Sequence, residues 1–288
     1  DTTLIHFIGK DNIVFHCIIF PIILKAHGSY ILPKNVPANE FLNLEGKKIS
    51  TSKNWAVWLH EYLKELPGRE DLLRYVLTSN APETKDNDFT WKEFQSRNNN
   101  ELVSIYGNFV NRVFVLINKY FKGVVPSPNN FDKKDSKILK SLKKFPKKIG
   151  KKIEEFKFRE ASQNLINISR LGNKYLAEEE PWKLVKTQMD KVKNIMYVAV
   201  QITATLSILS EPFLPFSSKK LKSLLKISES KLKWNDLINI NEIIKPGHII
   251  SKPELLFKKI EDEEIDYQIT KLTERSIENF DKKKKNSI

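Results

Sequence analysis

The sequence predicts a mainly α-helical fold in which a helix bundle follows a short strand–helix–strand segment. Two observations support this prediction. Apolar residues recur every three or four positions through most of the chain beyond residue 90, and residues 3–32 alternate short apolar runs with one helix-length apolar segment. The chain of 288 residues is long enough to bury a large core without disulfide bonds.

The first fifty residues carry the strand signals. Residues 3–8 predict a short buried strand that ends at Gly9, residues 12–25 predict a helix, and Tyr30-Ile31-Leu32 predicts a second strand. A strand, a helix and a strand in so short a stretch indicate one crossover of a parallel sheet. One crossover cannot cover both faces of a sheet, so we expect the chain to begin in the middle of a domain.

Beyond residue 54 the helix signals dominate. Residues 55–66 have a helical pattern that ends at Pro67-Gly68. Thr90 and Glu93 have the spacing of a capping box, in which each side chain binds the backbone N–H of the other residue. The helix that follows ends at Lys122-Gly123, and its apolar stripe consists of Leu102, Ile105, Tyr106, Phe109, Val113, Leu116, Ile117 and Tyr120.

A lysine-rich region comes next. Ten lysines and a single acid, Asp135, lie in residues 133–152. Pro146 falls inside the helical pattern of this region and is expected to kink or split the helix.

The last third of the chain continues the helical pattern. Residues 154–180 predict one continuous helix, and residues 190–210 predict another that is strongly apolar. A shorter helix and a turn at Pro246-Gly247 follow, and the charged tail from Glu254 onward is compatible with one more helix. We interpret residues 91–270 as a helix bundle.

The net charge of +14 results from 49 lysines and arginines against 35 acids. An excess of this size favours an anionic partner, above all nucleic acid. The excess is almost wholly lysine, 42 residues against seven arginines, which a general preference for lysine, isoleucine and asparagine would also produce. Charge alone leaves both explanations open.

Cysteine content and hydropathy exclude other classes. Cys17 is the single cysteine, so the sequence contains no disulfide framework and no cysteine-based zinc site. The apolar run at residues 13–24 is short and is interrupted by His16 and Pro21, so we predict no transmembrane span. The sequence does not open with a basic-then-apolar signal peptide. We therefore expect a soluble, cytoplasmic protein without a membrane partner.

Residues 44–52 form a glycine-containing segment with two lysines and three consecutive hydroxyl residues. Such a loop can bring ammonium groups and backbone N–H donors to a phosphate chain. Solvated turns of the same composition are common, so the segment alone is a weak signal.

These features occur together with motifs that resemble class I methionyl-tRNA synthetases. The motifs, in the order of that family, are His6-Phe7-Ile8-Gly9-Lys10-Asp11, Phe15-His16, Phe20-Pro21, Asn35-Val36-Pro37-Ala38-Asn39-Glu40-Phe41-Leu42, Lys48-Ile49-Ser50-Thr51-Ser52, Asn98-Asn99-Asn100-Glu101-Leu102, Gly107-Asn108-Phe109-Val110-Asn111-Arg112 and Glu180-Pro181-Trp182. The segment at Lys48 is similar to the KMSKS signature of the family. Other class I synthetases share that signature but not this ensemble.

The resemblance implies a role for each matching residue. It implies a mobile signature loop with Lys48, Ser50 and Thr51 as catalytic residues, which closes on the triphosphate. It assigns ATP or adenylate binding to Gly9, Asp11, Leu42 and Lys48, the methionine pocket to Phe15, His16 and Phe20, and anticodon binding to Asn108, Arg112, Pro181 and Trp182. No residue of this chain is expected to bind a metal ion.

Without the resemblance, simpler interpretations apply. His16 in an apolar helix is then a core histidine, and Trp182 after a proline is a packing residue. Asn108 and Arg112, four residues apart, share one helix face that would be solvated. For the lysine-rich region we keep the simpler interpretation, a mainly solvated face with nonspecific attraction for RNA.

The sequence departs from the family in two ways. Thr51 replaces the second lysine of the signature, so either Lys48 suffices with Thr51 as a hydroxyl donor, which we favour, or Lys53 contributes. No His-x-Gly-His element occurs in the chain. That element, the first half of the nucleotide-binding fold and the zinc-bearing insertion of the family would all precede Asp1. We therefore expect a C-terminal fragment that binds tRNA weakly and does not activate methionine.

The resemblance also implies a domain division and partners. Residues 1–53 would be the end of a Rossmann-like α/β catalytic domain, 54–90 a connecting segment that contacts the tRNA stem, 91–270 the α-helical anticodon-binding domain, and 271–288 a charged tail or linker. The implied partners are tRNA(Met), methionine and ATP with Mg²⁺, and dimerisation would require a further C-terminal domain.

Three interpretations remain open at this point. The chain is either part of a methionine–tRNA ligase or a non-catalytic helical module that binds tRNA. A structural helical scaffold, whose charge reflects only lysine usage, is the third reading.

Overall fold

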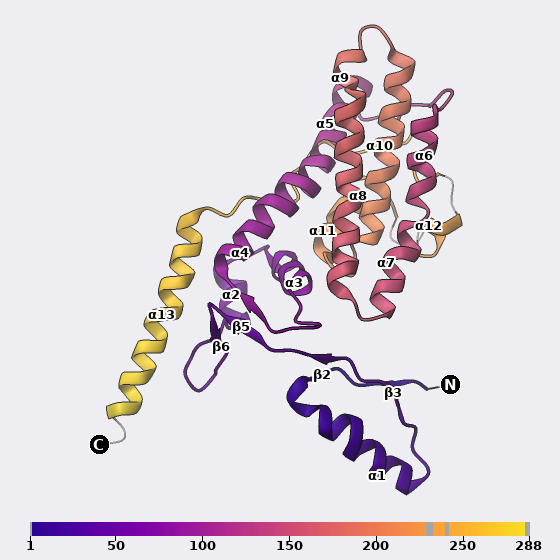
Figure 1. The fold of residues 1–288 in the computed structure, drawn as a ribbon. Coiled ribbons are helices and arrows are strands. Elements are labelled where there is room, and N and C mark those ends of the chain that lie inside the picture. The colour runs from indigo at the N-terminus through magenta and orange to yellow at the C-terminus, as the bar shows by residue number, and fades with distance from the viewer. Residues whose placement is uncertain (1, 229–232, 240–241, 286–288) are drawn as a thin grey trace. The chain divides into compact units, whose positions relative to one another are not determined.

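The computed structural model of the chain describes residues 2–228, 233–239 and 242–285. The chain divides into two compact units (Figure 1). The N-terminal unit comprises residues 1–59, 80–91 and 266–288, and the helical unit comprises residues 60–79 and 92–265. The predicted fold class, mainly α with a small α/β segment at the start, is confirmed.

Short strands form three small sheets in the N-terminal unit. The strands are β1 (Leu4–Ile5), β2 (Ile8–Gly9), β3 (Pro33–Asn35), β4 (Ala38–Asn39), β5 (Leu42–Leu44), β6 (Lys47–Lys48) and β7 (Asn87–Phe89). Strand β1 pairs with β3 and β2 with β4, both in parallel, while β5 lies between antiparallel β6 and parallel β7. A helix connects β2 to β3, so the predicted parallel crossover is confirmed.

The crossover helix is built from the 3₁₀ turn η1 (Lys10–Asn12), the π-helical segment η2 (Phe15–Ile19) and α1 (Phe20–His27), and it ends at Gly28 with φ 83°. The strand predicted at Tyr30–Leu32 is wrong, because these residues are exposed and the second strand begins at Pro33. Pro33 has no N–H to donate, which suits the first position of a strand.

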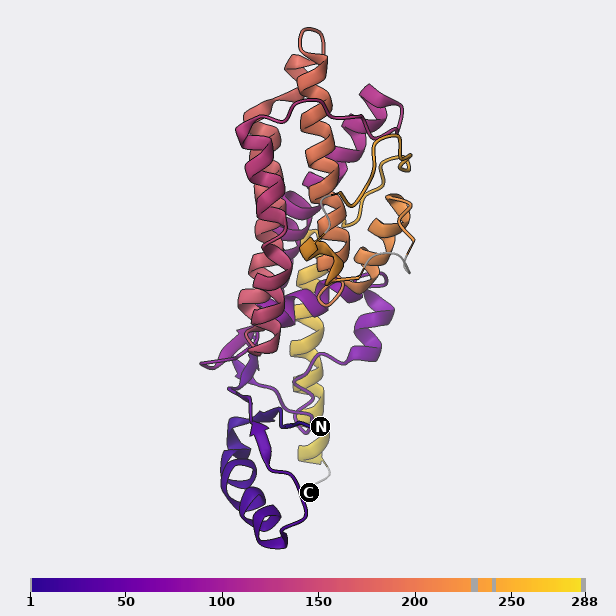
Figure 2. The same ribbon diagram turned by 90° about the vertical axis from the view of Figure 1, so that its right-hand side faces the viewer.

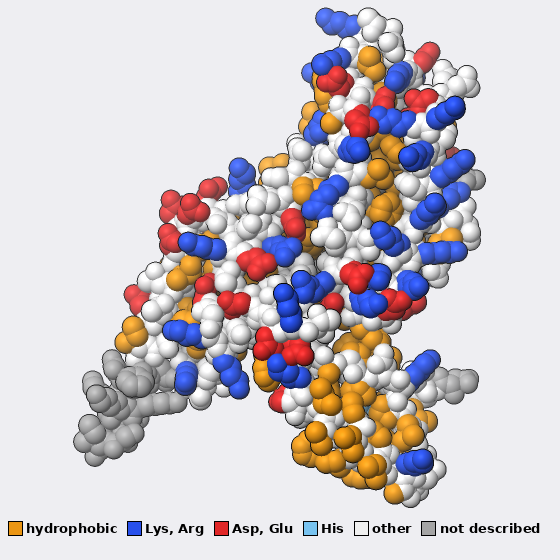
Figure 3. All heavy atoms as spheres, in the orientation of Figure 1, with side chains coloured by type: hydrophobic (Ala, Val, Ile, Leu, Met, Phe, Trp, Pro, Cys, Tyr) orange, Lys and Arg blue, Asp and Glu red, His pale blue; other side chains and the backbone are white. Residues whose placement is uncertain are grey.

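The crossover helix leaves most of its apolar side chains exposed. Only Leu24 is buried in α1. Figure 3 shows the apolar atoms gathered over this segment, and the exposed residues include Ile13, Val14, Phe15, Ile18, Ile19, Phe20, Ile22 and Ile23. Surfaces of this kind are typical of a face that packs against another protein element.

The helix predicted from Trp55 begins later than expected, as α2 (Leu59–Glu65). Trp55 instead pairs with Ser50 through two backbone hydrogen bonds of 2.9 and 3.0 Å, and its indole N–H donates to the carbonyl of Leu44 at 2.8 Å. These three bonds hold the residue in an extended pairing that a helix could not provide. The predicted end at Pro67-Gly68 is confirmed, since Gly68 has φ 74°.

The helical unit and the C-terminal segment contain the remaining helices. They are α3 (Glu70–Ser79), α4 (Trp91–Ser96), the π-helical segment η3 (Arg97–Gly107), α5 (Asn108–Phe121), α6 (Lys133–Leu142), α7 (Phe145–Glu154), α8 (Phe158–Glu179), α9 (Pro181–Leu184), α10 (Met189–Leu209), α11 (Pro215–Leu224), α12 (Asp236–Asn239) and α13 (Asp262–Lys285). The predicted apolar stripe is confirmed in η3 and α5, where Leu102, Tyr106, Phe109, Val113 and Ile117 are buried.

The helices around the lysine-rich region are shorter than predicted. The split near Pro146 is confirmed, because α6 ends at Leu142 and Pro146 lies in the first turn of α7. The continuous helix predicted for residues 154–180 is wrong. Phe156 has φ 59°, a left-handed conformation that ends one helix before α8 begins at Phe158.

Helix α10 forms the centre of the helical unit. It contacts α5, α6, α8, α9 and α11, and it runs alongside α8 in Figures 1 and 2. By length and composition it could cross a membrane, but 94% of its apolar window is buried inside the protein. A helix that is apolar on every face is typically a core helix.

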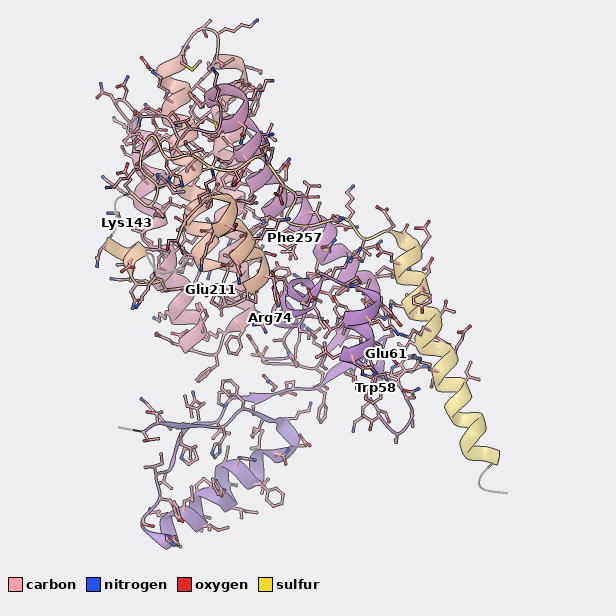
Figure 4. All side chains as sticks on the ribbon, turned by 180° about the vertical axis from the view of Figure 1, so that it is seen from behind. Trp58, Glu61, Arg74, Lys143, Glu211 and Phe257 are labelled. Atoms are coloured by element: carbon pink, nitrogen blue, oxygen red, sulfur yellow. The ribbon has the colours of Figure 1, made fainter. Side chains whose placement is uncertain are left out.

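Buried polar groups on α10 are satisfied inside the unit. The side-chain amide of Gln201 donates to the carbonyl of Ile244 at 2.6 Å and accepts from the N–H of Ile243 at 2.8 Å. The amide of Asn194 likewise binds the backbone of Asn129 and Asn130. The core helix therefore also fixes two connecting segments. A third connecting segment contains Phe257 (labelled in Figure 4), whose ring packs against the ring of Tyr106 in η3.

Helices α5 and α8 approach each other closely at Gly172. A Cβ atom at Gly172 would overlap the ring of Phe109, which is fully buried. Only glycine leaves this space open.

We expect Gly172→Ala to lower the free energy of unfolding by about 1–3 kcal/mol, because the added methyl group overpacks the α5–α8 contact. Gly150→Ala in α7 is the matched control, since its Cβ would meet only Trp234 at an ordinary 3.5 Å. The control should be as stable as the parent or slightly more stable. Urea unfolding followed by circular dichroism measures both, and equal stability of the two variants would contradict the proposed overlap.

Candidate functional site

The segment around Lys48 is a tight hairpin followed by a turn. Strands β5 and β6 are joined by Glu45 and Gly46, with φ 47° and 73°, as in the two-residue turns that favour glycine. The N–H of Gly46 donates to the carboxylate of Asp88 at 2.8 Å, and the N–H of Glu45 donates to the carbonyl of Phe89 at 2.9 Å. Residues of β7 thus hold the turn of the hairpin, while Lys48 at the end of β6 is exposed.

Lys48 lies near a second lysine that the sequence interpretation missed. The ammonium groups of Lys10 and Lys48 lie 4.4 and 5.7 Å from the centre of the Phe41 ring. Lys10 also binds Glu40 and Asp86, each at 2.6 Å, and these hydrogen bonds raise the pKa of Lys10. Lys48 has no ion pair with a described carboxylate, so it is the cation of this pair that remains available to a phosphate.

The residues after Lys48 form a turn closed by their own side chains. The hydroxyls of Ser50 and Ser52 lie 3.1 Å apart, and Ser50 accepts from the N–H of Lys53 at 3.3 Å. Thr51 and Lys53 are exposed in the same turn. Ser50 is thus engaged within the turn, whereas Thr51 and Lys53 face solvent.

Of the predicted nucleotide residues, Gly9 and Asp11 lie on consecutive elements, whereas Leu42 lies on β5, a strand of a different sheet. Gly9 ends β2, and a Cβ atom there would lie 2.6 Å from a carboxylate oxygen of Asp11. Asp11 is exposed in the turn η1, and Leu42 is half-buried at the start of β5. The Asp11 carboxylate therefore occupies the space that a side chain at position 9 would need.

The three residues predicted for a methionine pocket are only partly brought together. The Nδ1 atoms of His16 and His6 lie 3.2 Å apart, and the Phe20 ring is 5.5 Å from His6 and 6.5 Å from His16. Phe15 is 59% exposed and makes no ring contact with a described residue. His6, which the sequence interpretation missed, completes the cluster.

In the helical unit, Arg112 and Trp182 come together from different helices. The guanidinium of Arg112 on α5 lies 5.1 Å from the centre of the Trp182 ring, and Trp182 follows the buried Pro181 at the start of α9. Glu180 has φ 42°, which ends α8 and reverses the chain into α9. Partial burial lowers the pKa of Arg112, and no described carboxylate lies within ion-pair distance of it.

Asn108 lies one turn before Arg112 and is exposed. Its amide N–H₂ donates to the side-chain oxygen of Asn173 on α8 at 3.5 Å, while the amide N–H₂ of Asn173 donates to the carbonyl of Ile105 at 2.8 Å. Asn173 orients the amide of Asn108 so that its oxygen and one N–H remain available.

Sequence reasoning missed Lys10, His6 and Asn173. Lys10 and His6 lie inside a quoted motif, so their position was a usable signal. Asn173 had none, because its role depends on where α8 meets α5. Among the described residues, no group of three or more His, Cys, Asp or Glu is placed to hold a metal ion.

Two family models match the chain. The model described as "tRNA synthetases class I (M)" matches residues 1–114, and the model described as "Anticodon binding domain of methionyl tRNA ligase" matches residues 125–275. The second match covers the segment from the end of α5 to the middle of α13.

Curated relatives are named methionine–tRNA ligase. The protein from Christiangramia forsetii is 64% identical over 277 residues, covering 94% of this chain and 40% of the relative. The protein from Flavobacterium psychrophilum is 62% identical over 285 residues, covering 99% of this chain and 41% of the relative. The chain thus spans about two fifths of the length of the curated relatives it matches.

Solved structures agree in fold. The free methionyl-tRNA synthetase of Mycobacterium tuberculosis has a TM-score of 0.78 at 22% identity, covering 90% of this chain and 50% of that protein. The same enzyme bound by methionyl-adenylate has a TM-score of 0.80 at 24% identity, covering 88% of this chain and 50% of that protein. With the family-model match over more than half of its residues, the chain belongs to the methionyl-tRNA ligase family.

Proposed function

We propose that the protein is a methionine–tRNA ligase. Methionine and ATP react to methionyl-adenylate and pyrophosphate, and the methionyl group then passes to the terminal ribose of tRNA(Met), releasing AMP. The curated relatives carry this name, and the relative of similar fold binds methionyl-adenylate. In this proposal residues 1–53 belong to the catalytic domain, and residues 54–90 connect it to the anticodon-binding domain at residues 91–270. Residues 271–288 form a tail.

The observation that carries the proposal is that Arg112, which has no ion pair with a described carboxylate, lies beside the exposed ring of Trp182. An arginine without a carboxylate partner has five N–H donors available, and an exposed indole offers a stacking surface. Single-stranded bases are read by this combination of stacking and edge hydrogen bonds. We infer that a base of the anticodon stacks on Trp182, with its edge bound by Arg112 and Asn108 and with Pro181 fixing the tryptophan.

The second part of the proposal concerns adenylate formation. Attack of the methionine carboxylate on the α-phosphate develops negative charge that preorganised cations stabilise. Lys48 is exposed on the hairpin and has no described acidic partner, which suits this role, with Thr51 as a hydroxyl donor and Ser50 shaping the turn. The neighbouring Lys47 is exposed as well, but its ammonium group lies over the ring of Trp55 at 4.4 Å. Mg²⁺ would enter with ATP as part of the substrate.

The remaining assignments are also proposals. Gly9, Asp11 and Leu42 would contact the adenosine, and Phe15, His16 and Phe20 would contribute to the methionine pocket. A role in translation suits a cytoplasmic location without a membrane partner. The zinc of the family and any dimerising domain would lie in sequence that this chain does not span.

We expect Trp182→Ala to weaken binding of tRNA(Met) by roughly 5- to 150-fold, which corresponds to loss of one base–aromatic stack. The preference for tRNA(Met) over an anticodon-changed tRNA should disappear as well. Phe216→Ala is the control, because it removes a 60% exposed ring from the same unit. Fluorescence anisotropy titrations with both transcripts measure the effect, and an unchanged preference in Trp182→Ala would refute anticodon reading at this residue.

For catalysis, we expect Lys48→Ala in the full-length ligase to lower kcat of methionine-dependent ATP–pyrophosphate exchange by roughly 10²- to 10³-fold. The KM for methionine should change little, because Lys48 acts on the transition state. Lys53→Ala should be nearly neutral if Lys48 suffices. If kcat falls strongly in Lys53→Ala and only slightly in Lys48→Ala, the proposed role belongs to Lys53 and not to Lys48.

A further inference from the structure

A row of lysines follows the outer face of α6 and α7. These residues, here called the lysine stripe, are all exposed and recur every three or four positions, except that two of them are adjacent: Lys133, Lys137, Lys140, Lys144, Lys147, Lys148 and Lys151. Figure 3 shows Lys and Arg side chains along this side of the helical unit, and Figure 4 labels Lys143 at the junction of the two helices. The spacing places the stripe on one side of both helices.

The opposite side of the same helices faces the core. Ile138, Leu142, Pro146 and Ile149 are buried there with the same spacing. Asp135, the single acid among residues 133–152, is also buried and accepts a hydrogen bond from the Tyr175 hydroxyl at 2.6 Å. The exposed surface of this region therefore carries positive charge only.

The stripe is hardly neutralised by the rest of the protein. Lys151 lies 3.7 Å from Glu155, whereas the other six stripe lysines have no ion pair with a described carboxylate. Two neighbouring lysines outside the stripe are paired instead. Lys134 binds Glu178 and Glu179, each at 2.6 Å, and Lys152 binds Glu160 at 2.7 Å.

These flanking ion pairs also give the length and position of the stripe. They connect its two ends to the two ends of α8, at residues 178–179 and 160. A helix rises 1.5 Å per residue, so the stripe runs for about 27 Å beside α8. It starts at the end of the bundle where α8 passes into α9 and Trp182.

Like charges at this spacing destabilise a helix. An anionic partner with regularly spaced charges would remove that cost, and a nucleic-acid backbone has such charges along its length. Lysine is a flexible point charge without the planar fork of arginine, so it suits phosphates better than base edges.

We propose that the lysine stripe binds the sugar–phosphate backbone of RNA independently of base sequence. The stripe supplies affinity and alignment, while Asn108, Arg112 and Trp182 supply discrimination. The inference rests on the proposed function in that the RNA is the tRNA, but it concerns other residues and a different kind of contact.

The test replaces four stripe lysines by glutamine, Lys137, Lys140, Lys144 and Lys148. The control replaces four exposed lysines of the helical unit that lie outside α6 and α7 and have no described ion pair, namely Lys92, Lys219, Lys252 and Lys259. Both variants change the net charge of the chain equally. Binding of tRNA(Met) and of an anticodon-changed transcript is measured by anisotropy at several salt concentrations.

A plot of log affinity against log salt has a negative slope. We expect this slope to be shallower by roughly 3 in the stripe variant, because four phosphate contacts are lost. When salt rises from about 50 to 200 mM, the factor by which the affinity for RNA falls should then be roughly 60 times smaller for the stripe variant than for the parent. Both transcripts should be affected alike, and the ratio of their affinities should stay as in the parent. The control variant should keep nearly the parental slope, and both variants should unfold at or above the parental midpoint.

Equal slopes for the stripe and control variants would overturn the proposal, because charge position would then have no effect. A loss of the affinity ratio in the stripe variant would also overturn it, since the stripe would then read bases. If phosphatidylserine vesicles bind the parent but not the stripe variant, with RNA slopes unchanged, the partner is a membrane surface. If the parent does not distinguish the two transcripts, anticodon reading fails, and the difference in slopes still decides the role of the stripe.

Discussion

The helical unit depends on the burial of α10, whose side chains are all buried from Asn194 to Leu209. This helix has apolar side chains on every face, so it is stable only where other helices enclose it. Helices α5, α6, α8, α9 and α11 all contact it, and their apolar stripes face inward for the same reason. The lysine stripe of α6 and α7 is exposed as a direct result, because Ile138, Leu142 and Ile149 occupy the side that faces the core.

The position of Asn108, Arg112 and Trp182, the residues proposed to bind the anticodon, depends on one close contact within this packing. Gly172 admits the Phe109 ring, so α5 and α8 approach closely where Asn108 meets Asn173. Arg112 lies one turn further along α5. The reversal that follows α8 then brings the next helix, α9, to the guanidinium of Arg112. A glycine buried in the core thus helps to position the surface that we propose binds the anticodon, although it lies outside that surface.

Much of this arrangement could be predicted from local patterns, and the differences have physical reasons. Helical periodicity identified η3 with α5, because burial on one face leaves a regular apolar pattern. Helix α10 was identified instead by the length of its nearly continuous apolar run. The late start of α2 could not be predicted, since Trp55 is held by backbone and indole bonds to Ser50 and Leu44. The break at Phe156 has no glycine or proline to mark it. The role of Asn173 could not be predicted, because the sequence does not show which residues of two helices contact each other.

The amide of Gln201 limits how far the chain could be shortened. Its oxygen and nitrogen are satisfied by the backbone of Ile243 and Ile244, more than forty positions along the chain. A buried amide that loses its partners costs about 1–3 kcal/mol. Proteolytic trimming that removed these two residues would therefore weaken the core helix itself. The smallest stable version of the helical unit must keep the polypeptide at least through Ile244.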